Sequence, residues 1–205
     1  MTRNFHRIFY LLGLSGLALL QACQSSKGMQ SPALSAYFKA SPGTDTLRFE
    51  CFAESLHVPD TIPNQVFFTT IPAKLLREIE YLADSSQAIV LGRLQFPINH
   101  RISAYWVEIR QFWFIHHALL LYDRSKREFT ERITLAEWYG GDGGQVLIES
   151  WMFDYNGDGK RDLLRQETHH SIQFDGDEPI EQTQRSETLL LWGNRRFKQV
   201  GVPKR

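Results

Sequence analysis

The chain has few cysteines, no excess of charge of one sign, and no apolar run long enough to cross a membrane as a helix. Two cysteines in 205 residues cannot form a disulfide framework. The 23 Lys and Arg residues balance the 23 Asp and Glu residues, which argues against the basic surface that nucleic acids require. We therefore expect no nucleic-acid partner. A hydrophobic fraction of 42%, with 13% aromatic residues, is enough for a sizeable core and excludes a disordered chain.

The first 22 residues have the pattern of an export signal. Arg3 and Arg7 form a short basic head, and the 13 residues of Ile8–Leu20 are apolar and uncharged. As a helix, such a run is about 20 Å long, whereas a bilayer core is roughly 30 Å thick. Its length therefore suits the apolar region of a signal peptide better than a membrane span.

A cysteine motif, Leu20-Gln21-Ala22-Cys23, follows this run directly. It resembles the lipobox of bacterial lipoproteins, in which a small residue precedes a cysteine that is lipidated and becomes the new N-terminus. The resemblance implies that residues 1–22 are removed and that Cys23 carries a lipid that attaches the protein to the cell envelope. Under the family's sorting rule, Gln24 implies the outer membrane. A secreted protein cut nearby and an uncleaved anchor are the alternative interpretations.

The rest of the chain is expected to form a linker and one domain. The stretch 24–41 is rich in Ser and Gln, which predicts that residues 23–44 are a lipid anchor and flexible linker. A β-rich globular domain is predicted at residues 45–203. Cys51 is the one thiol left in the mature chain, and its alternation with Leu47 and Phe49 predicts that it is buried.

Hydrophobic alternation predicts that the fold is mainly β, a single antiparallel β-sheet or meander domain. Short turns rich in Gly, Asp and Asn separate the strands at intervals of about ten residues. One amphipathic helix is predicted between Pro72 and Ser85, with apolar residues at 75, 76, 79 and 82 on one face. The strands are predicted at 47–52, 66–70, 88–96, 102–110, 112–122, 128–138, 145–153, 162–174, 181–192 and 195–200.

The sharpest motif is an oxygen-rich loop, Phe153-Asp-Tyr-Asn-Gly-Asp-Gly-Lys-Arg-Asp-Leu163. Counted from Asp154, side chains with oxygen atoms fall at positions one, three, five and nine, and a glycine falls at position six. Alternate side chains of such a loop converge on one centre, and hard oxygen ligands suit Ca²⁺. The predicted ligands are Asp154, Asn156, Asp158, Asp162 and the backbone carbonyl of Lys160. A turn that holds no metal is the alternative, because Asn, Asp and Gly are also common turn residues.

The loop differs from an EF-hand, because position twelve is Arg165 instead of a bidentate Glu. It resembles the DxDxDGxxDL calcium loops of FG-GAP and VCBS repeats, which join two β-strands. The resemblance implies a calcium-loop hairpin with a structural ion, which would stabilise the folded state by linkage. Those families usually build propellers from several copies, and with one copy only the loop is carried over.

Several other groups of residues are weaker candidates for a binding site. The pairs His116-His117 and His169-His170 point to opposite faces of their strands, so neighbours cannot chelate one ion together. A zinc site shared between the pairs is an alternative, as is a remote calcium ligand from the acidic turn 175–178. The segment Gly140–Gly144 lacks the lysine and hydroxyl of a phosphate loop and is predicted to be a plain loop. The five tryptophans are predicted to be core residues, with an exposed aromatic face for glycan or peptide as the alternative; they are Trp106, Trp113, Trp138, Trp151 and Trp192.

These features together predict a membrane-anchored, non-catalytic binding or structural module of the bacterial envelope, with an envelope protein or a glycan as partner. An envelope hydrolase acting on glycan or peptide is one alternative, with Glu108 and Glu149 as candidate carboxylates. An inhibitor or chaperone of an envelope enzyme is another.

Overall fold

The computed structural model describes residues 33–41, 43, 45–52, 59–79, 82, 84–141, 143–175 and 178–201. The predicted signal peptide, Cys23 and the first part of the predicted linker lie outside these residues. Within the described residues, no helix has the length and apolar character needed to span a membrane.

Strands make up most of the described chain, so the predicted mainly β class is confirmed. Two short α-helices, α1 (Asn64–Thr70) and α2 (Ala73–Leu76), and two 3-10 turns, η1 (Ala33–Tyr37) and η2 (Ser85–Gln87), accompany them. The strands are β1 (Lys39–Ala40), β2 (Leu47–Phe49), β3 (Asp60–Ile62), β4 (Ile89–Pro97), β5 (Ile102–Gln111), β6 (Phe114–Asp123), β7 (Glu128–Gly141), β8 (Gly144–Phe153), β9 (Asp162–Asp175), β10 (Glu178–Gly193) and β11 (Arg196–Val200).

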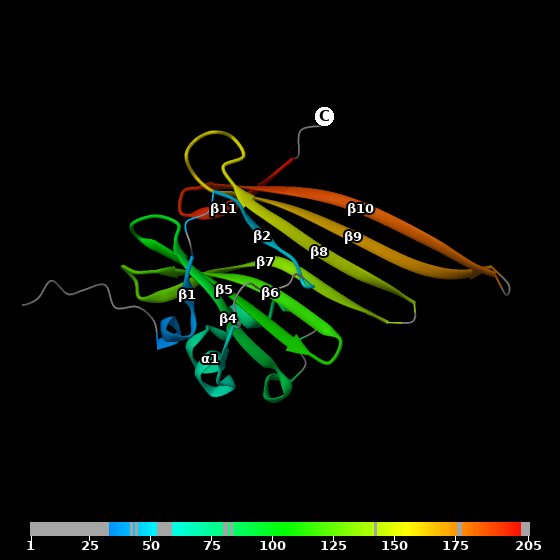
Figure 1. Ribbon diagram of the computed structural model, residues 1–205, viewed down its shortest axis with the longest axis horizontal. Helices are drawn as coiled ribbons and strands as arrows, with labels where there is room; N and C mark the ends of the chain where they lie inside the picture. Colours follow the sequence, from blue (N-terminus) through cyan, green and yellow to red (C-terminus); the bar gives the residue numbers. More distant parts are fainter. Residues whose placement is uncertain are drawn as a thin grey trace, which may run out of the picture. The chain divides into compact units, whose positions relative to one another are not determined.

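All of these strands belong to one sheet with the order β1-β4-β5-β6-β7-β8-β9-β10-β11 (Figure 1). From β4 to β11 each strand pairs antiparallel with the next, as a meander requires. The sheet is nevertheless mixed, because β1 runs parallel to β4. β3 pairs with β4 as well, and β2 pairs with β8. The sheet is open, with β1 and β11 at the two ends of the order.

The strands β4–β7 are covered on both faces. One face packs against η1 and the helices through a cluster that includes Phe67, Ile71 and Leu75. The other face packs against β2 and β8–β11 through a second cluster that includes Phe49, Met152 and Trp192. In Figure 1, α1 lies on the side of β4 and β5 that is turned away from β10. The central strands are therefore the middle layer of three, which explains the nearly continuous burial along β6.

The packed domain begins before residue 45, so the predicted linker of residues 23–44 is too long. Leu34 is fully buried and Phe38 nearly so, both in the cluster on the helix side. The carbonyl of Tyr37 lies so close to Gly92 on β4 that any side chain at this position would collide with it. The burial of Leu34 and Phe38 and the pairing of β1 with β4 together hold this segment on the sheet.

The helical region also differs from the prediction. The predicted strand at 66–70 is wrong: this segment is α1, because Phe67 and Ile71, four residues apart, are buried on the same side. The predicted helix after Pro72 is shorter than expected, since α2 ends at Leu76. Ile71 separates the two helices in an extended conformation (φ −85°, ψ 128°), which is the preference of a residue before proline.

Candidate functional sites: an oxygen-rich loop and an aromatic groove

The oxygen-rich loop joins β8 to β9, so the predicted hairpin is present. β8 ends at Phe153 and β9 begins at Asp162, and these two residues are paired. Gly157 and Gly159 have φ values of 75° and 76°, which glycine adopts at little cost. The two glycines of the motif therefore allow the sharp turn of the loop.

The first two predicted ligands face the backbone of the loop. The Asp154 carboxylate accepts hydrogen bonds from three amides, those of Gly157 (2.8 Å) and Asp158 (3.0 Å) at Oδ1 and that of Gly159 (2.8 Å) at Oδ2. Oδ1 of Asn156 accepts a hydrogen bond from the amide of Asp158 at 3.0 Å. These bonds draw the side chains at positions one and three toward the centre of the loop.

Asp158 is paired with Lys160. The backbone amide of Lys160 donates to Oδ1 of Asp158 at 2.9 Å, and its Nζ donates to Oδ2 at 2.8 Å. The hydrogen bonds with Lys160 lower the pKa of the Asp158 carboxyl, and Asp158 in turn raises the pKa of the Lys160 ammonium. Asp162 and Asp154 also raise the pKa of Lys160 by electrostatic attraction. The ammonium thus lies in the combined field of three loop carboxylates.

Asp162 is the buried member of the set, with 1% of its surface exposed. Its Oδ1 accepts a hydrogen bond from the backbone amide of Trp192 at 2.8 Å, whereas Oδ2 has no hydrogen-bond partner. A buried carboxylate oxygen without a partner is costly, and a bound cation would satisfy it. The orphan oxygen and the hard-oxygen donor set both fit a calcium ion.

In the described part of the chain, no three His, Cys, Asp or Glu side chains lie close enough together to hold a metal ion. Within the loop, Asp154 is engaged with amides and Asp158 with Lys160. A calcium ion at Asp158 would therefore compete with the Lys160 ammonium, which is hydrogen-bonded to Oδ2 of Asp158. The calcium site remains a prediction.

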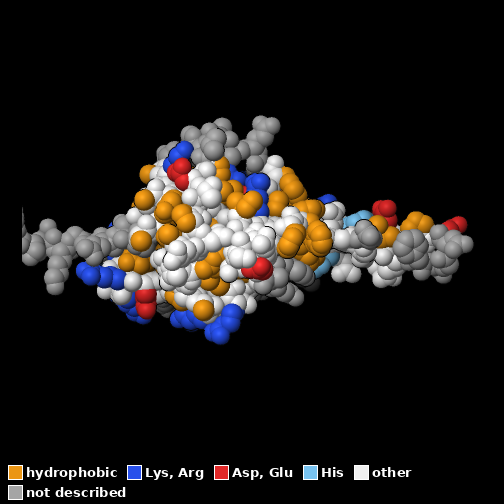
Figure 2. All heavy atoms as spheres, turned by 90° about the horizontal axis from the view of Figure 1, so that it is seen from below, with side chains coloured by type: hydrophobic (Ala, Val, Ile, Leu, Met, Phe, Trp, Pro, Cys, Tyr) orange, Lys and Arg blue, Asp and Glu red, His pale blue; other side chains and the backbone are white. Residues whose placement is uncertain are grey.

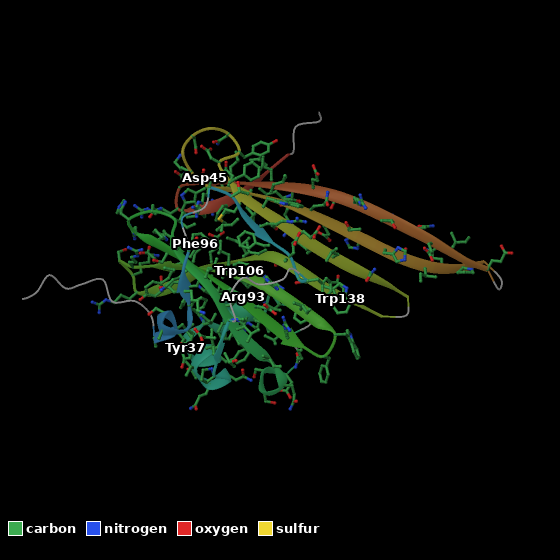
Figure 3. All side chains as sticks on the ribbon, in the orientation of Figure 1. Tyr37, Asp45, Arg93, Phe96, Trp106 and Trp138 are labelled. Atoms are coloured by element: carbon green, nitrogen blue, oxygen red, sulfur yellow. The ribbon has the colours of Figure 1, made fainter. Side chains whose placement is uncertain are left out.

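A second group of titratable residues lies inside the sheet, on β4, β5 and β6. Glu108 is fully buried and accepts hydrogen bonds from the guanidinium groups of Arg93 (Nε, 2.6 Å) and Arg110. A β-bulge between Gly92 and Leu94 places Arg93 out of the regular alternation, which turns its side chain toward Glu108. In Figure 3, Arg93 and Trp106 lie close together on the neighbouring strands β4 and β5.

The charges of this group favour an ionised Glu108. Burial opposes ionisation, but the charge of Arg93 and the hydrogen bonds from Arg93 and Arg110 outweigh it, so the pKa of Glu108 is lowered from 4.5. Burial also lowers the pKa of His117 to about 3, so this imidazole is neutral at neutral pH. The two arginines therefore supply the positive charge. Glu108 is the paired anion of a buried network and not a proton donor.

The neighbouring histidines do point to opposite faces, as predicted. His117 packs against Trp106 on the inner side of the sheet. His116 stacks on Phe114 on the helix side, where it is hydrogen-bonded to Glu137. Burial lowers the pKa of His116 as well.

Cys51 is buried, with 7% of its surface exposed, as the sequence predicts. Burial, together with the nearby carboxylates of Glu108 and Glu137, raises the pKa of its thiol to about 12. The thiol is therefore protonated at neutral pH and is a core side chain.

A groove of about 620 Å³ lies at the tip of the β5–β6 hairpin. Its walls are this tip, the glycine-rich ends of β7 and β8, and residues 169–171 of β9. The described residues that line it include no Asp, Glu, Lys or Arg. A neighbouring hollow of about 410 Å³ shares Gly140, Gly141 and Gly144 with the groove and reaches Trp138 and Ile172. Figure 2 shows hydrophobic side chains gathered beside the pale-blue histidines in this region.

The tip of the hairpin is built from two large aromatic residues. The strand predicted at 112–122 begins only at Phe114, because Phe112 and Trp113 form the turn between the paired residues Gln111 and Phe114. Phe112 is 80% exposed and Trp113 67%, and Phe112 has a φ of 50°. A two-residue hairpin turn normally takes Gly or Asn at such a position, and strain of this kind costs about 1–3 kcal/mol.

The glycines on the opposite wall fall into two classes. A Cβ on Gly140 would lie 2.7 Å from the Cβ of Gln145, and one on Gly144 would collide with the carbonyl of His170. These two glycines are required by the packing of β7, β8 and β9. A Cβ on Gly141 or Gly143 would meet nothing within 4 Å, so strand packing does not require glycine at either position.

No family of known proteins matches the chain, and no curated protein or solved structure is significantly similar to it. Its class is therefore defined by the fold itself, an open and mainly antiparallel sheet whose central strands are buried between two layers.

The groove is the feature that sequence reasoning missed. An unbroken apolar run from Phe112 to Ile115 favours a strand, and the segment Gly140–Gly144 was predicted to be a plain loop. A usable signal was the number of residues between 111 and 114: two antiparallel strands that join directly need a turn, and only Phe112 and Trp113 are available for it.

Proposed function

We propose that the protein is a lipid-anchored, non-catalytic binding module of the bacterial cell envelope, with a calcium-stabilised loop between β8 and β9. The binding role is supported above all by the turn of Phe112 and Trp113. Exposing two large apolar side chains beside a groove, one of them in a strained conformation, is not explained by folding or solubility. Strain and exposure of this kind are expected where a ligand is bound.

The calcium ion would be structural. It would neutralise the carboxylates of Asp154, Asp158 and Asp162 and satisfy the orphan oxygen of Asp162. Because Asp162 also accepts the amide of Trp192, an ion held there would link the loop to β10. Binding to the folded state alone raises the free energy of unfolding in proportion to the logarithm of the calcium concentration.

A thermal melt tests the calcium proposal. A chain that starts at Gln24 contains every described residue and is melted in EDTA and then in millimolar calcium, beside an Asp158→Ala variant. We expect a large calcium-dependent rise in melting temperature that the variant lacks. An equal melting temperature in EDTA and calcium for the unchanged chain would show that the loop is an ordinary turn.

Cell fractionation tests the lipid anchor. The lipobox resemblance of Leu20–Cys23 predicts that Cys23→Ser moves the protein out of the membrane fraction, because the lipidated atom is lost. Retention of the variant in the membrane fraction would overturn the anchor while leaving the calcium proposal intact.

Among the described residues, neither Glu108 nor the lining of the groove supports the alternative of an envelope hydrolase. Glu108 is fully buried and bonded to two guanidinium groups, so it cannot reach a substrate. The groove has no carboxylate among its described lining residues, whereas glycan or peptide hydrolysis needs an acid–base pair at the scissile bond.

A further inference from the structure

We propose that the groove binds an uncharged sugar chain, with the rings of Phe112 and Trp113 stacked on the apolar faces of the sugar rings. This inference rests on the proposed binding role and adds the chemical class of the ligand.

The aromatic turn supplies a stacking platform. The ring centroids of Phe112 and Trp113 are 6.1 Å apart and the rings are tilted by 45°, so the two faces are not packed flat against each other. Both side chains are mostly exposed at the edge of the groove. A pyranose ring presents C–H groups on one face, and the electron-rich face of an aromatic ring attracts them.

The remaining lining offers polar groups to sugar hydroxyls. Gln145, His169, His170 and Ser171 all line the groove. Nε2 of His169 is bonded to Glu167, and Nδ1 of His170 is bonded to Thr183 at 3.2 Å. Because neighbouring side chains of β9 point to opposite faces, one of the two imidazoles faces the groove, and its hydrogen bond orients the ring so that the other nitrogen is available to a ligand.

The charge and shape of the groove favour sugar over a charged ligand. An ionic ligand or a charged peptide would need opposite charges to replace its water, and no Asp, Glu, Lys or Arg is among the described lining residues. Gly141 and Gly143 carry no side chain where a Cβ would meet only open space, so their backbone lines the groove directly. The volume of about 620 Å³ is within the range of small-ligand sites and has room for a short oligosaccharide.

Tryptophan fluorescence and calorimetry test the proposal on the chain that starts at Gln24. The probes are neutral hexasaccharides of glucose, mannose, xylose, galactose and N-acetylglucosamine, with hexagalacturonate as the charged comparison. Trp113 is the most exposed of the tryptophans, so stacking on it should shift the emission. We expect saturable binding of at least one neutral hexasaccharide. Binding of hexagalacturonate alone, or of none of the probes, would overturn the proposal.

Two variants locate the site. Trp113→Ala should weaken binding about tenfold, the loss expected for one aromatic contact. Phe112→Gly should weaken binding and at the same time raise the melting temperature, because glycine removes the strain at φ 50°. Ile89→Ala removes an exposed apolar side chain that does not line the groove and should leave the affinity unchanged. Equal affinity of Trp113→Ala and the unchanged chain would exclude the groove.

The sugar-binding test can fail or succeed independently of the tests of the proposed function. Neither the calcium melt nor the fractionation of Cys23→Ser involves a sugar. If they succeed and no sugar binds, only the ligand class is wrong. If they fail while sugar binding depends on Trp113, the groove assignment stands and the anchor or the calcium loop is wrong.

Discussion

Trp106 donates its indole N–H to Nδ1 of His117, 3.0 Å away. Because Nδ1 accepts this bond, the proton of the neutral imidazole is on Nε2. Nε2 has no hydrogen-bond partner and lies 3.7 Å from Oε2 of Glu108, beyond hydrogen-bond distance. The imidazole is thus held by the indole beside the Glu108 anion and remains neutral.

Because of this arrangement, the free energy of unfolding depends on pH in the acid range. The pKa of His117 is lowered from 6.5 to about 3 in the folded protein, with burial as the largest cause. Between these two values the unfolded chain binds a proton that the folded chain does not, so the free energy of unfolding falls as the pH falls below 6.5. His116, whose pKa is also lowered, acts in the same direction.

We expect urea denaturation at pH 7, 6, 5 and 4 to show this decline, and His117→Gln to show less of it. Gln retains an acceptor for Trp106 and does not titrate. NMR of the imidazole ring supplies an independent check. A His117 ring that titrates near pH 6.5 in the folded protein would contradict the prediction.

Replacing Glu108 should be strongly destabilising. Glu108→Gln leaves the guanidinium of Arg93, whose side chain is only 11% exposed, without its carboxylate partner. Breaking a buried ion pair in this way costs about 3–5 kcal/mol. Equilibrium urea unfolding at pH 7 measures the loss.

The matched control is Glu128→Gln. Glu128 and Lys126 form a surface pair at 3.6 Å, with exposed side-chain fractions of 55% and 58%. Such pairs contribute about 0–1 kcal/mol, so the control should unfold close to the unchanged protein. Similar losses in the two variants would show that the Glu108 network is not a buried pair in solution.

The glycines of the groove wall allow a second matched comparison. Gly144 has a φ of 147°, and a Cβ there would collide with the carbonyl of His170. Gly144→Ala should therefore cost about 1–3 kcal/mol through backbone displacement. Gly141→Ala adds a methyl group where nothing lies within 4 Å and should change stability by less than about 0.5 kcal/mol. Thermal denaturation of both variants measures the two losses of stability, and equal losses would contradict the prediction.

Much of the sheet could be predicted because its strands differ from their turns in period and composition. The segments from β4 to β11 were predicted as strands, with bounds that shift by up to three residues. What failed depends on tertiary context. Phe67 and Phe68 favour a strand locally, yet the sheet face offers a surface on which a helix buries Phe67 and Ile71 together. The segment of Leu34 and Phe38 is too short to show a period, and only contact with the sheet reveals it.

The candidate site was predictable where spacing alone defines it. The ligand spacing from Asp154 to Asp162 lies within nine consecutive residues, so the sequence contains the whole loop. Pairing with a distant residue was not predictable: the amide of Trp192 reaches Asp162 only because β10 pairs with β9. The groove likewise combines two hairpins and a segment of β9 and has no sequence pattern of its own.

The last prediction separates the two roles of Asp162. Its Oδ1 holds the amide of Trp192, and its Oδ2 is buried and unpaired. Asp162→Asn keeps an oxygen acceptor for the amide and removes the negative charge, so in EDTA the variant should melt at or near the temperature of the unchanged chain. In calcium it should lose most of the stabilisation, since a carboxylate ligand contributes more than a neutral oxygen.

Asp158→Ala is the comparison variant for this test. Asp158 is exposed and paired with Lys160 at the surface, so its loss should also change little in EDTA. If both variants lose the calcium response, the ion lies between the exposed and the buried carboxylates. A full calcium response in Asp162→Asn would remove Asp162 from the ligand set, and the orphan oxygen would then need another partner, such as an ordered water.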